Sequence, residues 1–347
     1  MDDAVDLDDY DWASLGHAYG SAEDTRNLLV LLLEGDQDEQ AYALGQLEMS
    51  VLHQGSIYSS TAPSALFMAS ILDDPRTLSP HESVYPWDDR QRPLRAALLE
   101  FLGNVAESAA EEYDDPDVEA CRAIRPQLYT AVAPFVDDED PSVREAALGA
   151  VSALAEVAPA EVFHRVLTTS TDRRERAGAV LTLGTRGEDT SALLTDDDPA
   201  IRACAALAPG CADNPQATQM VLDTLLDPWT ADEWFEPPLP QFGGWFRFTL
   251  IAAAVARTES FEQLLPAALA LVPMCSEYTV DSDWGPLLTK AFPEPYAGTF
   301  TPAQRKFVAA LLDNDENWGN VSNRCGWLRK CGLPDERAEL RAVIASA

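Results

Sequence analysis

An Asp-Pro dipeptide, followed by an arginine and an alanine-rich apolar run, is the feature that most constrains the fold of this chain. In residues 137–154 the apolar side chains recur with the spacing of one helix face: Val143, Ala146, Ala147, Ala150, Val151 and Leu154. Asp140 is placed to accept hydrogen bonds from the first N–H groups of such a helix. Pro141, at the first helical position, loses only an N–H that has no partner there.

The same pattern returns at Asp198, Pro199 and Arg202, and Arg174 opens another Arg-x-x-Ala sequence between the two copies. The three arginines, with Arg144 as the first, are separated by about the length of one helical hairpin. This arrangement resembles the HEAT-repeat family, in particular the short repeats of the phycobilisome-lyase type. The resemblance implies stacked helical hairpins.

The repeat signature has a structural role in this interpretation. We expect Arg144 and Arg202 to hydrogen-bond acids such as Asp138 and Asp196, and so to tie neighbouring turns together. The signature residues are Asp140, Pro141, Arg144, Arg174, Asp198, Pro199 and Arg202.

Two short motifs near the start support the same fold. The sequences HAYG (17–20) and HQGSIYSSTAP (53–63) look like the opening of a group of bacterial HEAT-repeat proteins. That likeness implies a fold and no settled activity.

We therefore predict an all-α chain, a right-handed α-solenoid of HEAT-like helical hairpins with irregular Pro- and Trp-rich loops. Residues 1–347 would form a single solenoid with four parts. These are an acidic N-terminal segment (1–24), HEAT-like repeats (25–226), a Pro- and aromatic-rich loop (227–244) and diverged helical repeats (245–347). In the last part we expect helices from about Trp245 to Arg257 and at 261–272, 302–312, 321–330 and 335–346.

The charge balance narrows the classes of partner. There are 58 Asp and Glu against 24 Lys and Arg, a formal net charge of −34. Such a field repels nucleic acid and anionic membranes and accelerates encounters with basic proteins, although acids at helix N-termini and plain solubility also explain it. No run approaches the roughly 20 apolar residues that span a bilayer. Acids instead of bases precede the first arginine, Arg26, so we expect no signal peptide and a cytoplasmic protein, monomeric when free.

Catalytic and metal-binding patterns are not found in the sequence. The six cysteines form no CxxC pair, and we expect them to be reduced, small buried residues. The four histidines lie in no zinc-binding arrangement, and no phosphate-binding loop or nucleophile elbow occurs. We predict no catalytic residue, no metal and no cofactor.

Candidate partner contacts come from loops that combine aromatic and acidic residues. Residues 73–93 and 227–248 are rich in proline, and aromatic side chains in such loops bury large areas at binding surfaces or fill a gap in the solenoid. We expect Trp234 and Phe235 to be the most exposed. The candidates are Trp87, Trp229, Trp234, Phe235, Glu236, Asp283, Trp284, Asp315 and Trp318.

The favoured function is a non-enzymatic protein-binding module for a basic partner, in its sharper form a cytosolic inhibitor or immunity protein that neutralises a basic toxin. One alternative is a scaffold or adaptor subunit of a larger complex, in which the acidity only confers solubility. The other is a lyase-like enzyme or enzyme accessory, which the repeat resemblance alone implies.

Overall fold

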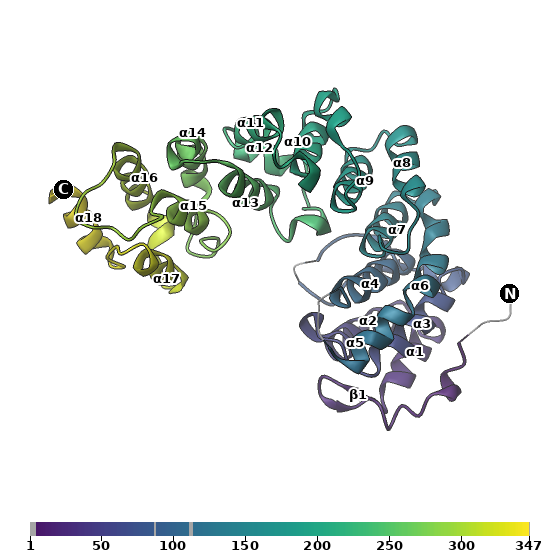
Figure 1. Cartoon of the computed structure of the whole chain (residues 1–347). Coiled ribbons are helices and arrows are strands. Elements are labelled where there is room, and N and C mark those ends of the chain that lie inside the picture. Colours follow the sequence, from purple (N-terminus) through teal and green to yellow (C-terminus); the bar gives the residue numbers. More distant parts are fainter. Residues whose placement is uncertain (1–4, 87, 111–113, 347) are drawn as a thin grey trace. The chain divides into compact units, whose positions relative to one another are not determined.

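The structure, a computed structural model, describes residues 5–86, 88–110 and 114–346 and is all-α (Figure 1). The chain separates into two compact units, Met1–Thr169 and Ser170–Ala347. The boundary falls inside the segment 25–226, which we predicted as one run of repeats. The single solenoid over 1–347 stays a prediction.

The N-terminal unit contains eight α-helices among its described residues: α1 (Thr25–Glu34), α2 (Gln37–Val51), α3 (Thr61–Ser70), α4 (Leu94–Ser108), α5 (Pro116–Ala123), α6 (Arg125–Val132), α7 (Pro141–Ala153) and α8 (Ala160–Thr169). Its short 3-10 helices are η1 (Leu7–Asp9), η2 (His53–Gly55), η3 (Pro75–Leu78) and η4 (Ala133–Asp137). Two-residue antiparallel strands form two pairs, β1 (Gly16–His17) with β2 (Gly20–Ser21) and β3 (Pro80–His81) with β4 (Arg92–Pro93).

The C-terminal unit continues with ten α-helices in its described part: α9 (Arg173–Thr185), α10 (Pro199–Leu207), α11 (Pro215–Thr224), α12 (Pro228–Glu233), α13 (Phe246–Arg257), α14 (Phe261–Leu271), α15 (Trp284–Ala291), α16 (Pro302–Asp313), α17 (Asn323–Lys330) and α18 (Arg337–Ser346). Its 3-10 helices are η5 (Ser191–Thr195), η6 (Pro209–Cys211), η7 (Pro240–Phe242), η8 (Val272–Met274) and η9 (Asp315–Trp318). Several helices pack on others close to them in the chain, for example α10 on α9 and α11, and α14 on α15 and α16.

The predicted repeat helix is confirmed as α7. Its six predicted apolar residues are all buried. The Asp140 carboxylate accepts the Ser142 N–H at 2.8 Å, and Asp198 accepts the Ala200 N–H at 2.9 Å at the start of α10. Pro141 and Pro199 follow these caps at the first helical positions.

The signature arginines bind main-chain oxygens. Nη1 of Arg144 donates to the carbonyls of Asp138 and Glu139, at 2.9 and 3.0 Å. Nη1 of Arg202 donates to the carbonyls of Asp196 and Asp197 in the same way, at 2.7 and 3.1 Å. Arg144 and Arg202 therefore bind Asp138 and Asp196 as expected, through the main-chain carbonyls of these acids.

Arg174 was predicted as the signature arginine of its repeat, two residues before the arginine that occupies the equivalent position. The carboxylate of Asp172 accepts the N–H groups of Arg174 and Glu175 and so caps α9. The position four residues after the cap, which Arg144 and Arg202 occupy in their helices, therefore belongs to Arg176. Arg174 instead donates to the carbonyl of Pro237 and holds the Pro-rich loop.

Cationic side chains also bind the carbonyl ends of neighbouring helices. Arg122 and Arg125 donate to Ala109 and Ala106 at the end of α4, both at 2.9 Å. The same arrangement recurs where Arg257 reaches Leu207 at the end of α10, Lys290 reaches Thr258 after α13, and Arg337 and Arg341 reach Leu312 in α16. The last carbonyls of a helix have no partner within it. These bonds supply donors to carbonyls that packing would otherwise leave without a hydrogen bond.

The predicted C-terminal helices are confirmed to within two residues as α13, α14, α16, α17 and α18. Two helices were not predicted. Asp227 caps α12 inside the predicted loop 227–244, and α15 begins at Trp284. Both start at acidic residues that we expected to lie in loops.

Helices α4 and α7 pack closely at Gly103, where an added Cβ would lie 3.1 Å from Cα of Ala150. By contrast, nothing lies within 4 Å of a Cβ placed on Gly149 of α7. We expect Gly103→Val to lower the free energy of unfolding by about 1–3 kcal/mol through overpacking. We expect Gly149→Ala to raise it by about 0.5–1 kcal/mol through helix propensity. Urea unfolding measures both, and effects of the same sign would contradict the packing described.

Candidate binding groove

The predicted contacts in the Pro-rich loop are only partly exposed. Trp229 is 59% exposed, Glu236 is exposed and Trp234 is half-buried. Phe235 is 1% exposed, so its predicted exposure was wrong. Its ring packs edge-on against Phe242 and Phe246, with centroids 5.2 and 5.0 Å away. The loop therefore contributes its own small apolar core, with Trp229 left outside.

The other predicted contacts divide in the same way. Asp283 and Trp284 were predicted in an exposed loop, but both are buried. They lie at the start of α15, where Asp283 accepts the Trp284 N–H at 2.6 Å. Asp315 is exposed and forms an ion pair with Arg337. Trp318 is half-buried and donates to the Leu311 carbonyl at 2.9 Å. Trp87 lies outside the described residues.

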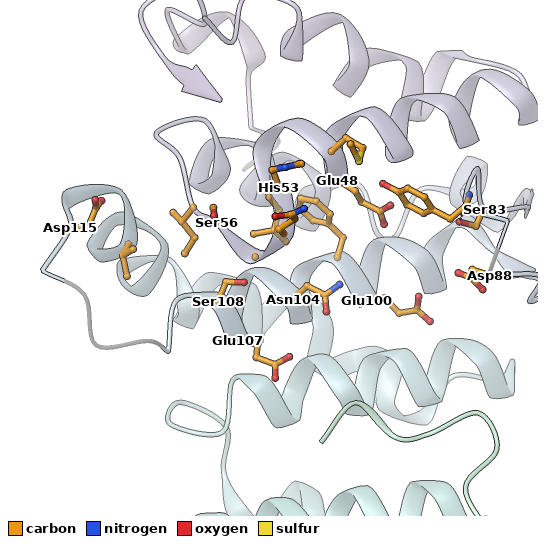
Figure 2. Close-up of a pocket in the computed structure, with 18 of the residues that line it drawn as sticks. Glu48, His53, Ser56, Ser83, Asp88, Glu100, Asn104, Glu107, Ser108 and Asp115 are labelled. Carbon is orange, nitrogen blue, oxygen red and sulfur yellow. Dashed lines mark hydrogen bonds between the residues drawn. The ribbon is translucent and has the colours of Figure 1, made fainter. Parts of the chain in front are cut away.

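The N-terminal unit contains a groove of about 1280 Å³. It is lined by α2, η2, the described residues between Ser83 and Arg92, α4 and the start of α5 (Figure 2). Among the described residues of its lining, six acids outnumber two arginines and one histidine: Glu48, Asp88, Glu100, Glu107, Asp114, Asp115, Arg90, Arg92 and His53. Apolar side chains contribute as well: Met49, Leu52, Ile57, Phe101 and Val118.

Both arginines of the groove are bound by two of its acids. Arg90 donates to Asp88 at 2.7 Å and to Glu100 at 2.9 Å, and Arg92 donates to the same pair at 2.9 and 3.0 Å. The Arg92 side chain is only 7% exposed. Hydrogen bonds from Arg90, and then from Arg92, hold the pKa of Asp88 well below its ordinary value against the effect of burial. These four residues attach to α4 the described part of residues 82–93, hereafter the 82–93 segment.

The same segment is attached to α2 through Gly45. A Cβ on Gly45 would overlap Cγ2 of Val84, so the segment lies directly on the helix. The hydroxyl of Tyr85 donates to the Gly45 carbonyl at 3.4 Å and also hydrogen-bonds Glu48. At its base, β3 and β4 pair His81 with Arg92, and burial, aided by Arg92, lowers the pKa of His81 to about 4.

Glu48 is an acid of the groove whose pKa is raised, opposite in direction to that of Asp88. Burial raises its pKa from an ordinary 4.5 to about 7, and the charges of Glu100 and Asp88 add to this effect. Arg92 and the Tyr85 hydroxyl act in the opposite direction. Glu48 is therefore partly protonated near neutral pH, next to carboxylates that are already ion-paired.

The two N-terminal motifs meet near the groove. Oγ of Ser60, in the second motif, donates to the carbonyl of Gly16, just before the first motif, at 2.8 Å. The Tyr19 hydroxyl lies 3.5 Å from Nδ1 of His53, and His53 lines the groove. Gln54 follows with φ of 52°, a left-handed conformation that is uncommon outside glycine. The two motifs therefore pack against each other.

Sequence reasoning identified the 73–93 loop but missed the helical half of the groove. Glu48, Glu100, Asn104 and Glu107 received no role. A signal was present in α4, where Glu100, Asn104 and Glu107 occur at i, i+4 and i+7, a polar stripe on a helix that is otherwise mostly buried.

Comparison with known proteins adds no assignment, since no family model matches the sequence and no curated protein matches it significantly. Within the described residues, no helix combines the length and apolar character needed to cross a membrane. The same residues contain no group of three or more His, Cys, Asp or Glu side chains placed to hold a metal ion.

The raised pKa of Glu48 predicts a pH dependence of stability. Below about pH 4.5 Glu48 is protonated in the folded and unfolded states, and well above about pH 7 it is ionised in both. Between these values the folded state binds more protons, so the contribution of Glu48 to the free energy of unfolding falls as pH rises, by roughly 1–3 kcal/mol. Urea unfolding of wild type and Glu48→Gln across this range measures it. Parallel pH profiles would contradict it.

Attachment of the 82–93 segment to α2 is tested by a pair of substitutions. We expect Gly45→Ala to displace the segment, because the new methyl group overlaps Val84. Trypsin should then cleave faster after Arg90, which precedes Gln91. Adding Val84→Ala removes the overlap and should restore the wild-type rate. Equal cleavage of wild type and Gly45→Ala would show that the segment does not depend on this contact.

Proposed function

We propose that this chain is a protein-binding protein built from HEAT-like helical hairpins of a right-handed α-solenoid, and that its groove receives a basic partner. The fold proposal is supported by the repeated cap and arginine bonds. Asp140 with Arg144, and Asp198 with Arg202, make the same contacts in two different helices. Such repeats present extended surfaces, and binding is their common use.

The excess of acids over bases in the groove is the observation that supports the functional proposal. Asp88 and Glu100 are occupied by Arg90 and Arg92, which leaves no surplus positive charge from the arginines. The remaining carboxylates, of which Glu107, Asp114 and Asp115 are exposed, give the groove a net negative field. A concave surface of one sign focuses that field and raises the rate at which an oppositely charged partner arrives.

The whole chain adds to this attraction, since its net charge is −34. In its sharper form, the proposal is a cytosolic inhibitor or immunity protein whose partner is a basic toxin, such as a nuclease. An acidic groove would then compete with the phosphate groups that such an enzyme binds. Trp229, exposed on α12, stays a predicted additional contact.

The partner would be isolated with the tagged protein as bait in nuclease-treated lysate, at low and high ionic strength, and identified by mass spectrometry. We expect one basic protein that is retained at low salt and lost at high salt, because exposed charge pairs are screened. A neutral partner retained at both ionic strengths would favour the scaffold function instead.

Charge reversal then locates the binding surface. Glu107 and Asp313 are exposed acids in the last turns of α4 and α16, where a lysine suits the helix dipole. We expect Glu107→Lys to weaken binding of the isolated partner about tenfold. Asp313→Lys should have less effect, although it changes the net charge equally. Equal losses would show that the partner responds to total charge and not to the groove.

A further inference from the structure

Glu48 differs from the other acids of the groove in its surroundings. It projects from α2 into the groove that Glu100 of α4 and Asp88 also line (Figure 2). Tyr85 hydrogen-bonds it, and the charge of Arg92 also acts on it. Among the described residues, no Lys, Arg or His side chain forms an ion pair with it, because the nearby arginines are bound to Asp88 and Glu100. Glu48 is thus a half-buried carboxylate without a counter-ion of its own.

The groove beside Glu48 is not uniformly polar. Met49 is 37% exposed and Ile57 is half-buried, while the buried side chains of Leu52, Phe101 and Val118 lie behind them in the lining. A bound segment would therefore meet both apolar contacts and carboxylates. An amphipathic segment with lysine or arginine among apolar residues matches this lining by charge and by polarity.

We propose that Glu48 is the anchor for one lysine or arginine side chain of an amphipathic protein segment, and that the segment binds with release of a proton from Glu48. This inference rests on the proposed function of the groove. It adds the chemical class of the ligand and a dependence of affinity on pH.

The proton release follows from linkage. The pKa of free Glu48 is raised to about 7, first by burial and then by Glu100 and Asp88. A docked cation favours the ionised carboxylate and lowers that pKa again. At about pH 7 roughly half a proton per complex is then released, and affinity rises about tenfold between about pH 6 and pH 8. His53 also lines the groove and is therefore substituted as a control.

The test uses isothermal titration calorimetry of the full chain with a synthetic amphipathic peptide of leucine and arginine. A second peptide carries citrulline, a neutral isostere, in place of arginine. Titrations in buffers of different ionisation enthalpy count the protons released. We expect release with the arginine peptide only. Release should be lost in Glu48→Gln and retained in Glu107→Gln and His53→Gln.

The outcomes distinguish the anchoring role of Glu48 from the binding of a basic partner by the groove. Binding that weakens in Glu107→Lys, but proceeds without proton release or is unchanged in Glu48→Gln, would overturn the anchor and leave the groove function intact. Release that disappears in His53→Gln and persists in Glu48→Gln would also overturn it. Absence of arginine-peptide binding at every pH, with all variants folded, would overturn both proposals.

Discussion

Hydrogen bonds from arginine and lysine to the carbonyl ends of helices are the interaction on which this fold depends. Short helices leave a large share of their carbonyls without internal partners, and close packing removes the water that would otherwise satisfy them. At α4, α10, α13 and α16 a cation from another element supplies the donor. A guanidinium suits this role because it stays charged and presents several N–H groups in a fixed plane.

This use of cations also explains the chemistry of the groove. The chain has 24 Lys and Arg, and several of them bind helix ends and signature turns. In the groove, Arg90 and Arg92 serve the same structural purpose, since they hold the 82–93 segment against α4 through Asp88 and Glu100. The acids that remain are a surplus. The groove stays negative because the six acids among its described residues outnumber Arg90 and Arg92, which are paired with Asp88 and Glu100.

Much of the helical architecture was predictable because its signals are local. Apolar spacing and the Asp-Pro caps located α7 and α10, and periodicity located most helices after Trp245. Errors arose where a choice depended on distant residues. Phe235 is buried by Phe242 and Phe246 across a run of prolines, which no local pattern reveals. Glu48 lies forty residues before Asp88 in the chain, and nothing in the sequence around either residue indicates that they share a cavity.

The direction of the carbonyl bonds has a consequence for synthesis of the chain. Arg122 and Arg125 follow α4, Arg257 follows α10, Lys290 follows α13, and Arg337 and Arg341 follow α16. In each case the donor leaves the ribosome after the helix whose end it completes. The ends of α4, α10, α13 and α16 are therefore synthesised before their donors, whereas the last turn of α18 receives Arg305 from the earlier helix α16.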